Sequence, residues 1–211
     1  MLIAIDGPAG AGKSTVARAV ADALGFTYLD SGAMYRCVAL AALRAGIDPD
    51  DGVRLGPLAW SIEISLTGGV RLNGEDVDEA IRAPEVGAAA SRVSVHPQVR
   101  AAMVERQRDL IATGRYVAEG RDIGTVVSPE APLKIFLNAS PDERARRRAA
   151  QTGERVGTVR TAQQVRDDRD ASREHGAMRA AEDAVELDTT GVAVDEVVGQ
   201  IVGLARERGL A

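Results

Sequence analysis

Apolar residues occur along this chain in two kinds of run, and the two kinds alternate. Short continuous apolar runs are typical of strands buried on both faces, and between them apolar residues recur with the period of an amphipathic helix. Strands alternating with helices predict an α/β fold with a parallel sheet. The predicted strands cover residues 2–6, 26–29, 116–118, 133–137 and 184–187, and the predicted helices cover 14–24, 31–44, 97–112, 141–150, 162–173 and 194–208. Residues 151–161 contain two glycines and are predicted to be irregular and mobile.

Residues 61–95 follow a different pattern. Apolar and polar residues alternate over 61–66, and Asn73-Gly74 follows a second short apolar run. This is typical of a small antiparallel unit joined by tight turns. Helical patterns follow at 78–83 and 85–95. We therefore predict a single domain over 1–211, with a core at about 1–60 and 96–211 and an inserted subdomain at 61–95.

A glycine-rich loop lies between the first predicted strand and the first predicted helix, and its sequence matches G-x-x-x-x-G-K-[ST]. In such a P-loop, backbone N–H groups and the helix N-terminus bind phosphate oxygens, the lysine reaches the β- and γ-phosphates, and the hydroxyl can ligate Mg²⁺. We expect ATP to bind here, with Ser14 as a metal ligand. The expected contacts are Gly7, Pro8, Ala9, Gly10, Ala11, Gly12, Lys13, Ser14 and Thr15.

The P-loop does not by itself define a reaction, because many classes of enzyme share it. Larger switch and motor proteins need more residues than the 211 present, and no Asn/Thr-Lys-x-Asp guanine-recognition motif occurs. A small kinase is therefore the favoured class. A regulatory module that binds ATP without transferring phosphate is the alternative from outside the enzymes.

Arginines gather at three places where a second anionic substrate would be expected. Ser31 and Arg36 follow the second strand, and the Arg121-Asp122 pair follows the third. A solvent-exposed helix face is the simpler interpretation of any single arginine in the third place, residues 144–173. All of them together indicate a lid over two phosphate-bearing substrates. They are arginines 144, 146, 147, 148, 155, 160, 166, 169 and 173.

Composition narrows the possible partners. The net charge of −5 argues against nucleic acid, whose binding requires a basic face. Cys37 is the only cysteine, which fits a reducing cytosol. No apolar run is long enough to span a membrane, and the N-terminus lacks a basic signal-peptide region. His96 and His175 have no partners at metal-binding spacing, so no zinc site is predicted.

Four motifs together resemble the cytidylate kinase family. They are Asp6-Gly7-Pro8 with the P-loop, residues 29–36 (LDSGAMYR), residues 119–127 (EGRDIGTVV) and residues 166–170 (RDDRD). The resemblance covers nearly the whole chain, with the motifs in the family's order. It implies a three-layer P-loop kinase with a parallel sheet, a monophosphate-binding insert and an arginine-rich lid at about 148–166.

The resemblance also implies an activity: ATP and CMP (or dCMP) give ADP and CDP (or dCDP), with Mg²⁺, in a cytoplasmic monomer. Lys13, Arg121, Arg166 and Arg173 would be catalytic. Arg36 and Arg121 suit the acceptor phosphate, Asp170 suits the sugar hydroxyls, and Ser91, Arg100 and Asp122 suit cytosine. The full set implied to contact the pyrimidine nucleotide is Ser31, Arg36, Ser91, Arg100, Arg121, Asp122, Arg166, Asp170 and Arg173.

One position departs from the family pattern: Glu119 stands before Gly120 where the family has aspartate, which keeps a carboxylate there. The acceptor is already an anion, so catalysis would consist mainly of positioning and charge neutralisation. Other acceptors remain open from the residues alone, namely AMP, UMP, shikimate or a coenzyme precursor.

Overall fold

The computed structural model describes residues 1–210 and divides the chain into two compact units. One consists of Met1–Leu29 together with the chain from Ile111 onward, and we call it the sheet unit. The other is Asp30–Leu110, which we call the helical unit. Each is described by itself.

The sheet unit is built on five strands in the order β2-β6-β1-β7-β8. Their bounds are β1 Leu2–Asp6, β2 Thr27–Asp30, β6 Tyr116–Gly120, β7 Leu133–Asn138 and β8 Val185–Asp188. β1 is central and pairs in parallel with both β6 and β7, and β7 pairs in parallel with β8. The predicted α/β fold with a parallel sheet is confirmed. Every residue of β1 is buried, as its uninterrupted apolar pattern predicts.

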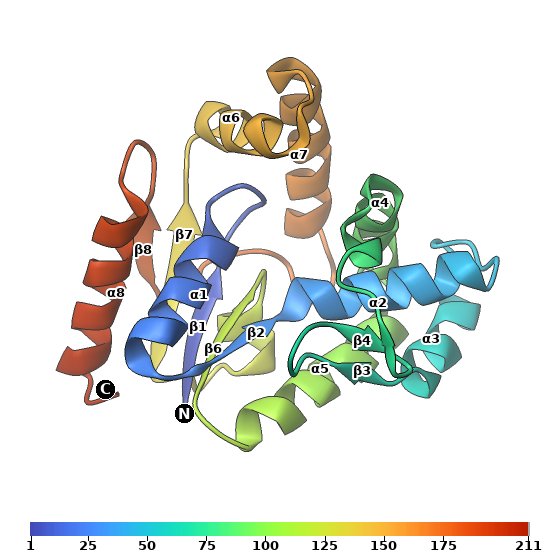
Figure 1. The fold of residues 1–211 in the computed structure, drawn as a ribbon, viewed down its shortest axis with the longest axis horizontal. Coiled ribbons are helices and arrows are strands. Elements are labelled where there is room, and N and C mark those ends of the chain that lie inside the picture. Colours follow the sequence, from blue (N-terminus) through green and yellow to red (C-terminus); the bar gives the residue numbers. More distant parts are fainter. Residues whose placement is uncertain (211) are drawn as a thin grey trace. The chain divides into compact units, whose positions relative to one another are not determined.

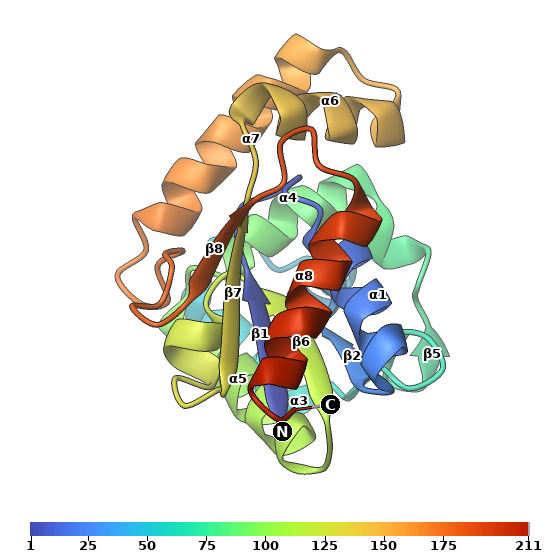
Figure 2. The ribbon, with the colours of Figure 1, turned by 90° about the vertical axis from the view of Figure 1, so that its left-hand side faces the viewer.

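Helices α1 (Lys13–Leu24) and α8 (Val194–Glu207) pack on one face of this sheet. Figure 2 shows α8 in front of the sheet with α1 beside it. Ile3 and Ile5 of β1 share a core cluster with Val20 of α1 and Ile201 of α8. This packing fixes the orientation of β1, and so the position at which the P-loop begins.

Helices α6 (Pro141–Thr152) and α7 (Val156–Ala171) form a hairpin beyond the end of β7 (Figure 1). α6 extends to Thr152 and α7 begins at Val156, so the prediction of an irregular segment over 151–161 is wrong except for residues 153–155. Gly153 ends α6 in the left-handed conformation, and Val159 packs on two alanines of α6. These contacts extend α7 toward its N-terminus despite Gly157.

A single π-helical turn, η2 (Ile123–Val127), follows β6 and was not predicted. Such turns are rare and often occur at functional sites.

The helical unit packs four helices around an apolar core: α2 Ser31–Arg44, α3 Gly52–Ser61, α4 Pro84–Val93 and α5 Pro97–Ala112, the last of which ends beyond the unit's boundary. A 3₁₀ turn, η1, covers Ala80–Arg82, where a helix over 78–83 was predicted. Asp30 caps α2 by accepting a hydrogen bond from the backbone N–H of Ala33, as expected from Asp30-Ser31-Gly32. α3 was not predicted.

The predicted antiparallel unit is a small sheet of three two-residue strands, in the order β3-β4-β5. They are β3 Ile64–Ser65, β4 Arg71–Leu72 and β5 Glu75–Asp76. The β4–β5 turn at Asn73 and Gly74 has positive φ at both residues, as the Asn-Gly signal predicts. The strand expected over 61–66 is much shorter, because Ser61 belongs to α3. Within residues 1–210, no helix is long and apolar enough to cross a membrane.

Candidate active site

The P-loop follows the central strand β1 and leads into α1. Gly7, Gly10 and Gly12 all have positive φ, at 146°, 81° and 93°. A Cβ atom at Gly7 would lie 2.0 Å from the Leu137 carbonyl oxygen, so the loop's path requires glycine there. Gly12 is the N-cap of α1 and makes no side-chain capping hydrogen bond, so this helix end suits an anion.

Lys13 folds back over its own loop. Its Nζ atom donates a 2.8 Å hydrogen bond to the Pro8 carbonyl, and only 7% of the residue is exposed. Burial, and after it the positive charge of Arg121, lower the pKa of Lys13 to about 7. Glu119 and Asp6 act in the opposite direction. An anionic ligand would restore the usual basicity, so the lysine is placed for a phosphate.

Ser14 and Glu119 meet beside the P-loop. The Ser14 hydroxyl, on an exposed residue, donates a 2.9 Å hydrogen bond to Oε2 of Glu119, which is 5% exposed at the end of β6. Tyr28 of β2 donates to the other oxygen, Oε1. A hydroxyl beside a carboxylate is the kind of oxygen donor set that Mg²⁺ prefers in P-loop enzymes. No cluster of three or more histidine, cysteine or acidic residues that could hold a metal occurs in residues 1–210. Magnesium would therefore need phosphate oxygens and water as further ligands.

Arg121 contacts the P-loop from the loop after β6. Its Nη1 atom donates a 2.9 Å hydrogen bond to the Gly7 carbonyl, and its Nε atom donates to Oδ2 of Asp170 at 2.9 Å. Lys13 and Arg121 thus place two cationic groups on the consecutive carbonyls of residues 7 and 8. This is a positively charged site at the carboxyl end of the central strand.

Three arginine side chains surround the carboxylate of Asp170. It is 1% exposed and pairs with Arg121 and Arg173, while Nε of Arg166 lies 4.0 Å from Oδ2. Burial alone would raise the pKa of Asp170, but the three positive charges hold it below its usual value. The structure therefore brings the predicted residues 121, 166, 170 and 173 together beside the P-loop.

The turn after β6 is fastened to β1 by Asp6. The Asp6 carboxylate accepts hydrogen bonds from the backbone N–H groups of Ile123 (2.9 Å) and Gly124 (2.7 Å). Burial outweighs these bonds and raises the pKa of Asp6 to about 6. Asp122, predicted to contact the base, is buried in the same turn, and its carbonyl accepts from the N–H groups of Val126 and Val127. The chain thus holds Asp122 in a fixed turn.

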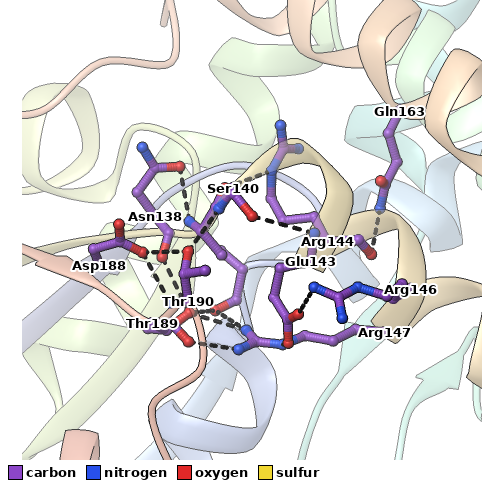
Figure 3. A network of polar contacts seen from close by, with 12 residues as sticks. Asn138, Ser140, Glu143, Arg144, Arg146, Arg147, Gln163, Asp188, Thr189 and Thr190 are labelled. Atoms are coloured by element: carbon purple, nitrogen blue, oxygen red, sulfur yellow. Dashed lines mark hydrogen bonds and ion pairs between the residues drawn. The ribbon is translucent and has the colours of Figure 1, made fainter.

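Two arginines of α6, Arg144 and Arg147, contact the backbone of the P-loop (Figure 3). Arg144 is buried and donates to the Ala9 carbonyl at 3.2 Å, and it pairs with Asp167 of α7. Arg147 donates to the carbonyl and hydroxyl of Thr189, at 2.6 and 2.9 Å, and to the Ala11 carbonyl at 3.4 Å. These two arginines therefore bind the loop's backbone. By contrast, Arg146 and Arg160 form ion pairs while more than half of each side chain is exposed.

In the helical unit, three of the four predicted residues are connected through one helix. Ser31 is buried in the first turn of α2, and Arg36 of the same helix donates to the Ile81 carbonyl at 3.0 Å. Arg100 of α5 is 5% exposed and its Nη1 atom lies 3.4 Å from the Tyr35 hydroxyl. Ser91 is buried in α4, where its carbonyl accepts from the Ser94 hydroxyl.

Several residues of this arrangement were not singled out from the sequence as site residues. Asp6 and Tyr28 reach the end of β6 and the turn after it from positions more than 90 residues away in sequence. Glu119 was noted only as a departure from a family pattern. The one signal was position: Asp6 is the last residue of β1 and Glu119 the second-last of β6, and strand ends line the ligand crevice of parallel sheets.

A P-loop after the central strand of a parallel sheet, with its lysine and a buried arginine cluster beside it, defines a P-loop phosphotransferase. A cytidylate kinase family model matches residues 3–207. The chain belongs to the cytidylate kinase family, a family of nucleoside monophosphate kinases, as the sequence motifs predicted.

Individual relatives agree. The chain is 48% identical over 216 residues to a protein named cytidylate kinase from Solibacter usitatus (strain Ellin6076), with 99% of this chain and 93% of that protein covered. It is also 48% identical to a bifunctional pantoate ligase/cytidylate kinase from Synechococcus sp. (strain CC9902), where 98% of this chain matches 45% of that protein. A solved shikimate kinase from Acinetobacter baumannii shares the fold, with a TM-score of 0.50, 16% identity, and 100% and 95% of the two chains covered.

Proposed function

We propose that this protein transfers the γ-phosphate of ATP to CMP and to dCMP, giving ADP with CDP or dCDP. Family membership supports the reaction class. The observation that carries the proposal is the pair of cations on the P-loop, where Lys13 and Arg121 bind the carbonyls of Pro8 and Gly7. Two positive groups at one loop suit a polyphosphate and a second phosphate brought against it.

ATP binds along residues 7–15 in this proposal. Lys13 exchanges the Pro8 carbonyl for the β- and γ-phosphates, and their charge keeps its ammonium group protonated. Ser14 would hold Mg²⁺ through its hydroxyl oxygen, and the Glu119 carboxylate would accept a hydrogen bond from that hydroxyl. Mg²⁺, when bound, would neutralise part of the phosphate charge.

The arginines that now surround Asp170 neutralise the transferring phosphoryl group. Arg121, Arg166 and Arg173 lie together on the buried carboxylate, so they are oriented before a substrate arrives. Preoriented charges contribute more to catalysis than charges that must reorganise. Asp170 also offers its carboxylate to the sugar hydroxyls of the acceptor.

The acceptor nucleotide binds through the remaining predicted residues. Arg36 and Arg121 hold its phosphate, Ser31 lies at the N-terminus of α2, and Ser91, Arg100 and Asp122 recognise cytosine. We propose that the insert at 61–95 serves this monophosphate and that residues at about 148–166 act as the lid. A monomer in the cytoplasm, without nucleic-acid or membrane partners, completes the proposal.

No general base is required, because a phosphate acceptor is already an anion at neutral pH. Catalysis then depends on holding donor and acceptor in line and on excluding water. Lysine, arginine and Mg²⁺ compensate the charge that the two substrates bring together.

A coupled assay of ADP release across acceptors tests this proposal. We expect CMP and dCMP to be turned over fastest among CMP, dCMP, UMP, AMP and shikimate. Much faster turnover of AMP would overturn the substrate assignment. ATP binding without acceptor-dependent ADP release would instead identify a non-catalytic module. Lys13→Ala is the matched negative control, with an expected loss of at least about 10²–10³-fold and an unchanged fold by circular dichroism. Near-wild-type turnover in that variant would contradict the mechanism.

A further inference from the structure

Four residues near the P-loop are linked by a series of contacts. Ser14 donates to Oε2 of Glu119, and Tyr28 donates to Oε1. The guanidinium carbon of Arg18 lies 4.9 Å from the centre of the Tyr28 ring. Arg18 and Ser14 are four residues apart on α1 and therefore share one helix face. These contacts join α1, β2 and β6, and both ends of the series lie on α1.

Tyr28 restricts the conformation of the Glu119 side chain. A glutamate side chain has three rotatable bonds, and fixing it in one conformation costs entropy. Here both carboxylate oxygens are hydrogen-bonded, each by a hydroxyl from a different element. Without the phenol, Oε1 would lose the donor on its β2 side, which removes one of the contacts that direct the carboxylate toward Ser14. The tyrosine hydroxyl therefore keeps Oε2 directed at the serine.

The ring of Tyr28 is itself held in place. It is half-buried against the apolar cluster between α1 and the sheet, and the Arg18 side chain covers it from outside. β2 neighbours β6 in the sheet, so Tyr28 and Glu119 reach each other across adjacent strands. The phenol therefore has a fixed position from which to direct the carboxylate.

We propose that Tyr28 is a positioning residue for the metal that accompanies ATP: it holds the Glu119 carboxylate beside Ser14 and so sets how tightly the divalent cation binds. This rests on the proposed function, in which Ser14 ligates Mg²⁺. Residues that orient metal-site groups from outside typically contribute about 10–100-fold in metal affinity. Because Tyr28 acts on an outer carboxylate, we expect the lower end of that range.

Tyr28→Phe tests the proposal, because it removes one oxygen and keeps the ring under Arg18. Mn²⁺ binding is measured by electron paramagnetic resonance on enzyme saturated with a non-hydrolysable ATP analogue. We expect about tenfold weaker Mn²⁺ binding. Binding of the analogue in the presence of a chelator should match the wild type. In steady-state assays, the Mg²⁺ concentration for half-maximal rate should rise while kcat at saturating Mg²⁺ changes little.

Tyr116→Phe is the matched control. It removes the same oxygen from a tyrosine at the other end of β6, where the hydroxyl lies 3.2 Å from Oγ1 of Thr113 at the surface. Its Mn²⁺ affinity should equal that of the wild type. Equal loss in both variants would mean that any phenol removed from this region weakens the site through the fold, and it would overturn the proposal.

A double-mutant cycle with Glu119→Asp separates positioning from packing. Aspartate is one methylene shorter, so we expect it to lose the Tyr28 hydroxyl. Tyr28→Phe should then weaken Mn²⁺ binding less than twofold in the Glu119→Asp background. Full tenfold loss in that background would show that Tyr28 does not act through Glu119. Wild-type Mn²⁺ affinity in Tyr28→Phe would overturn this inference alone. No Mn²⁺ binding by the wild type with nucleotide would overturn the proposed metal site as well.

Discussion

The surroundings of the P-loop and the surface of the helical unit use charged side chains in different ways. Beside the P-loop, Asp170 is 1% exposed and carries arginines whose side chains are themselves largely buried. In the helical unit, Arg92 pairs with Asp48 and Asp50, and the side-chain exposures are 37% for the arginine and 68% for each acid.

The buried ion pairs beside the P-loop carry a large desolvation cost, whereas the exposed pairs of the helical unit carry little. Removing ions from water is expensive, and a buried pair often stabilises a fold no more than apolar residues would. Buried, compensated charge beside a P-loop is therefore evidence of a functional demand. The surface pairs of the helical unit need no such explanation, because exposed ion pairs contribute little.

The largest expected effect is at Asp170. Asp170→Asn leaves the guanidinium groups of Arg121 and Arg173 buried without their counter-charge. Breaking one side of a buried ion pair typically costs about 3–5 kcal/mol of unfolding free energy. We expect a loss in that range by urea denaturation. Sulfate should recover more stability in the variant than in the wild type, because an anion can take the place of the carboxylate.

Asp50→Asn is the matched control, since it removes the same charge from an exposed pair. It should leave the denaturation midpoint and its response to sulfate close to the wild type. If Asp170→Asn were as stable as Asp50→Asn, the arginines beside the P-loop would not depend on their carboxylate. The contrast between the two regions would then fail.

The second effect is at Asp6, a buried acid held by backbone N–H groups. Its pKa in the folded protein is raised to about 6 from an ordinary value of 3.8. Between these values the folded state binds the proton more tightly than the unfolded state, so stability falls as pH rises through this window. A shift of this size corresponds to about 3 kcal/mol. Relative to Asp6→Asn, the wild type should therefore lose up to about 3 kcal/mol between pH 4 and pH 6.5.

Over the same pH range in which stability falls, the activity of the wild type should rise. The ionised Asp6 carboxylate accepts more strongly from Ile123 and Gly124 than the neutral acid does, so ionisation stabilises the turn that carries Asp122. We expect kcat/KM of the wild type to fall below about pH 6, and this acid limb to be missing in Asp6→Asn. An identical acid limb in both proteins would show that another group titrates there. In that case, the pH dependence of the unfolding free energy of the wild type relative to Asp6→Asn would still test the raised pKa of Asp6.

The sequence was most informative where structure is local. The apolar run of β1, the glycines of the P-loop and the capping Asp30 each specify their element within about ten residues, and their bounds match the structure closely. Helix α3 shows the opposite case. Its glycines and Pro57 are typical of loops, yet Asp51 caps it by accepting from the Arg54 N–H. Val53, whose carbonyl would pair with residue 57, is 83% exposed, so water can serve in place of the missing N–H.

Only the parts of the site that lie in short local motifs could be predicted from the sequence. Motifs named the P-loop and the arginines after the strands, because these residues stand in short recognisable patterns. The partners that orient them come from far along the chain: Tyr28 lies 91 residues from Glu119, and Asp6 lies 117 from Ile123. Only the strand order β2-β6-β1 brings these pairs together, and that order is a tertiary property that periodicity does not encode.

The smallest expected effect, at Arg92, is the sharpest test of the comparison. Arg92 joins the last turn of α4 to residues before α3, with two hydrogen bonds to Asp50 (2.8 and 2.6 Å) and one to Asp48 (2.5 Å). Good bidentate geometry and a network are the two conditions under which an exposed pair can matter. Exposure should still dominate, because water and salt screen both charges. We expect Arg92→Gln to lose less than about a fifth of what Asp170→Asn loses, and the loss to shrink further as salt is raised. A larger loss that persists in high salt would mean that geometry, and not burial, decides which ion pairs hold this fold together.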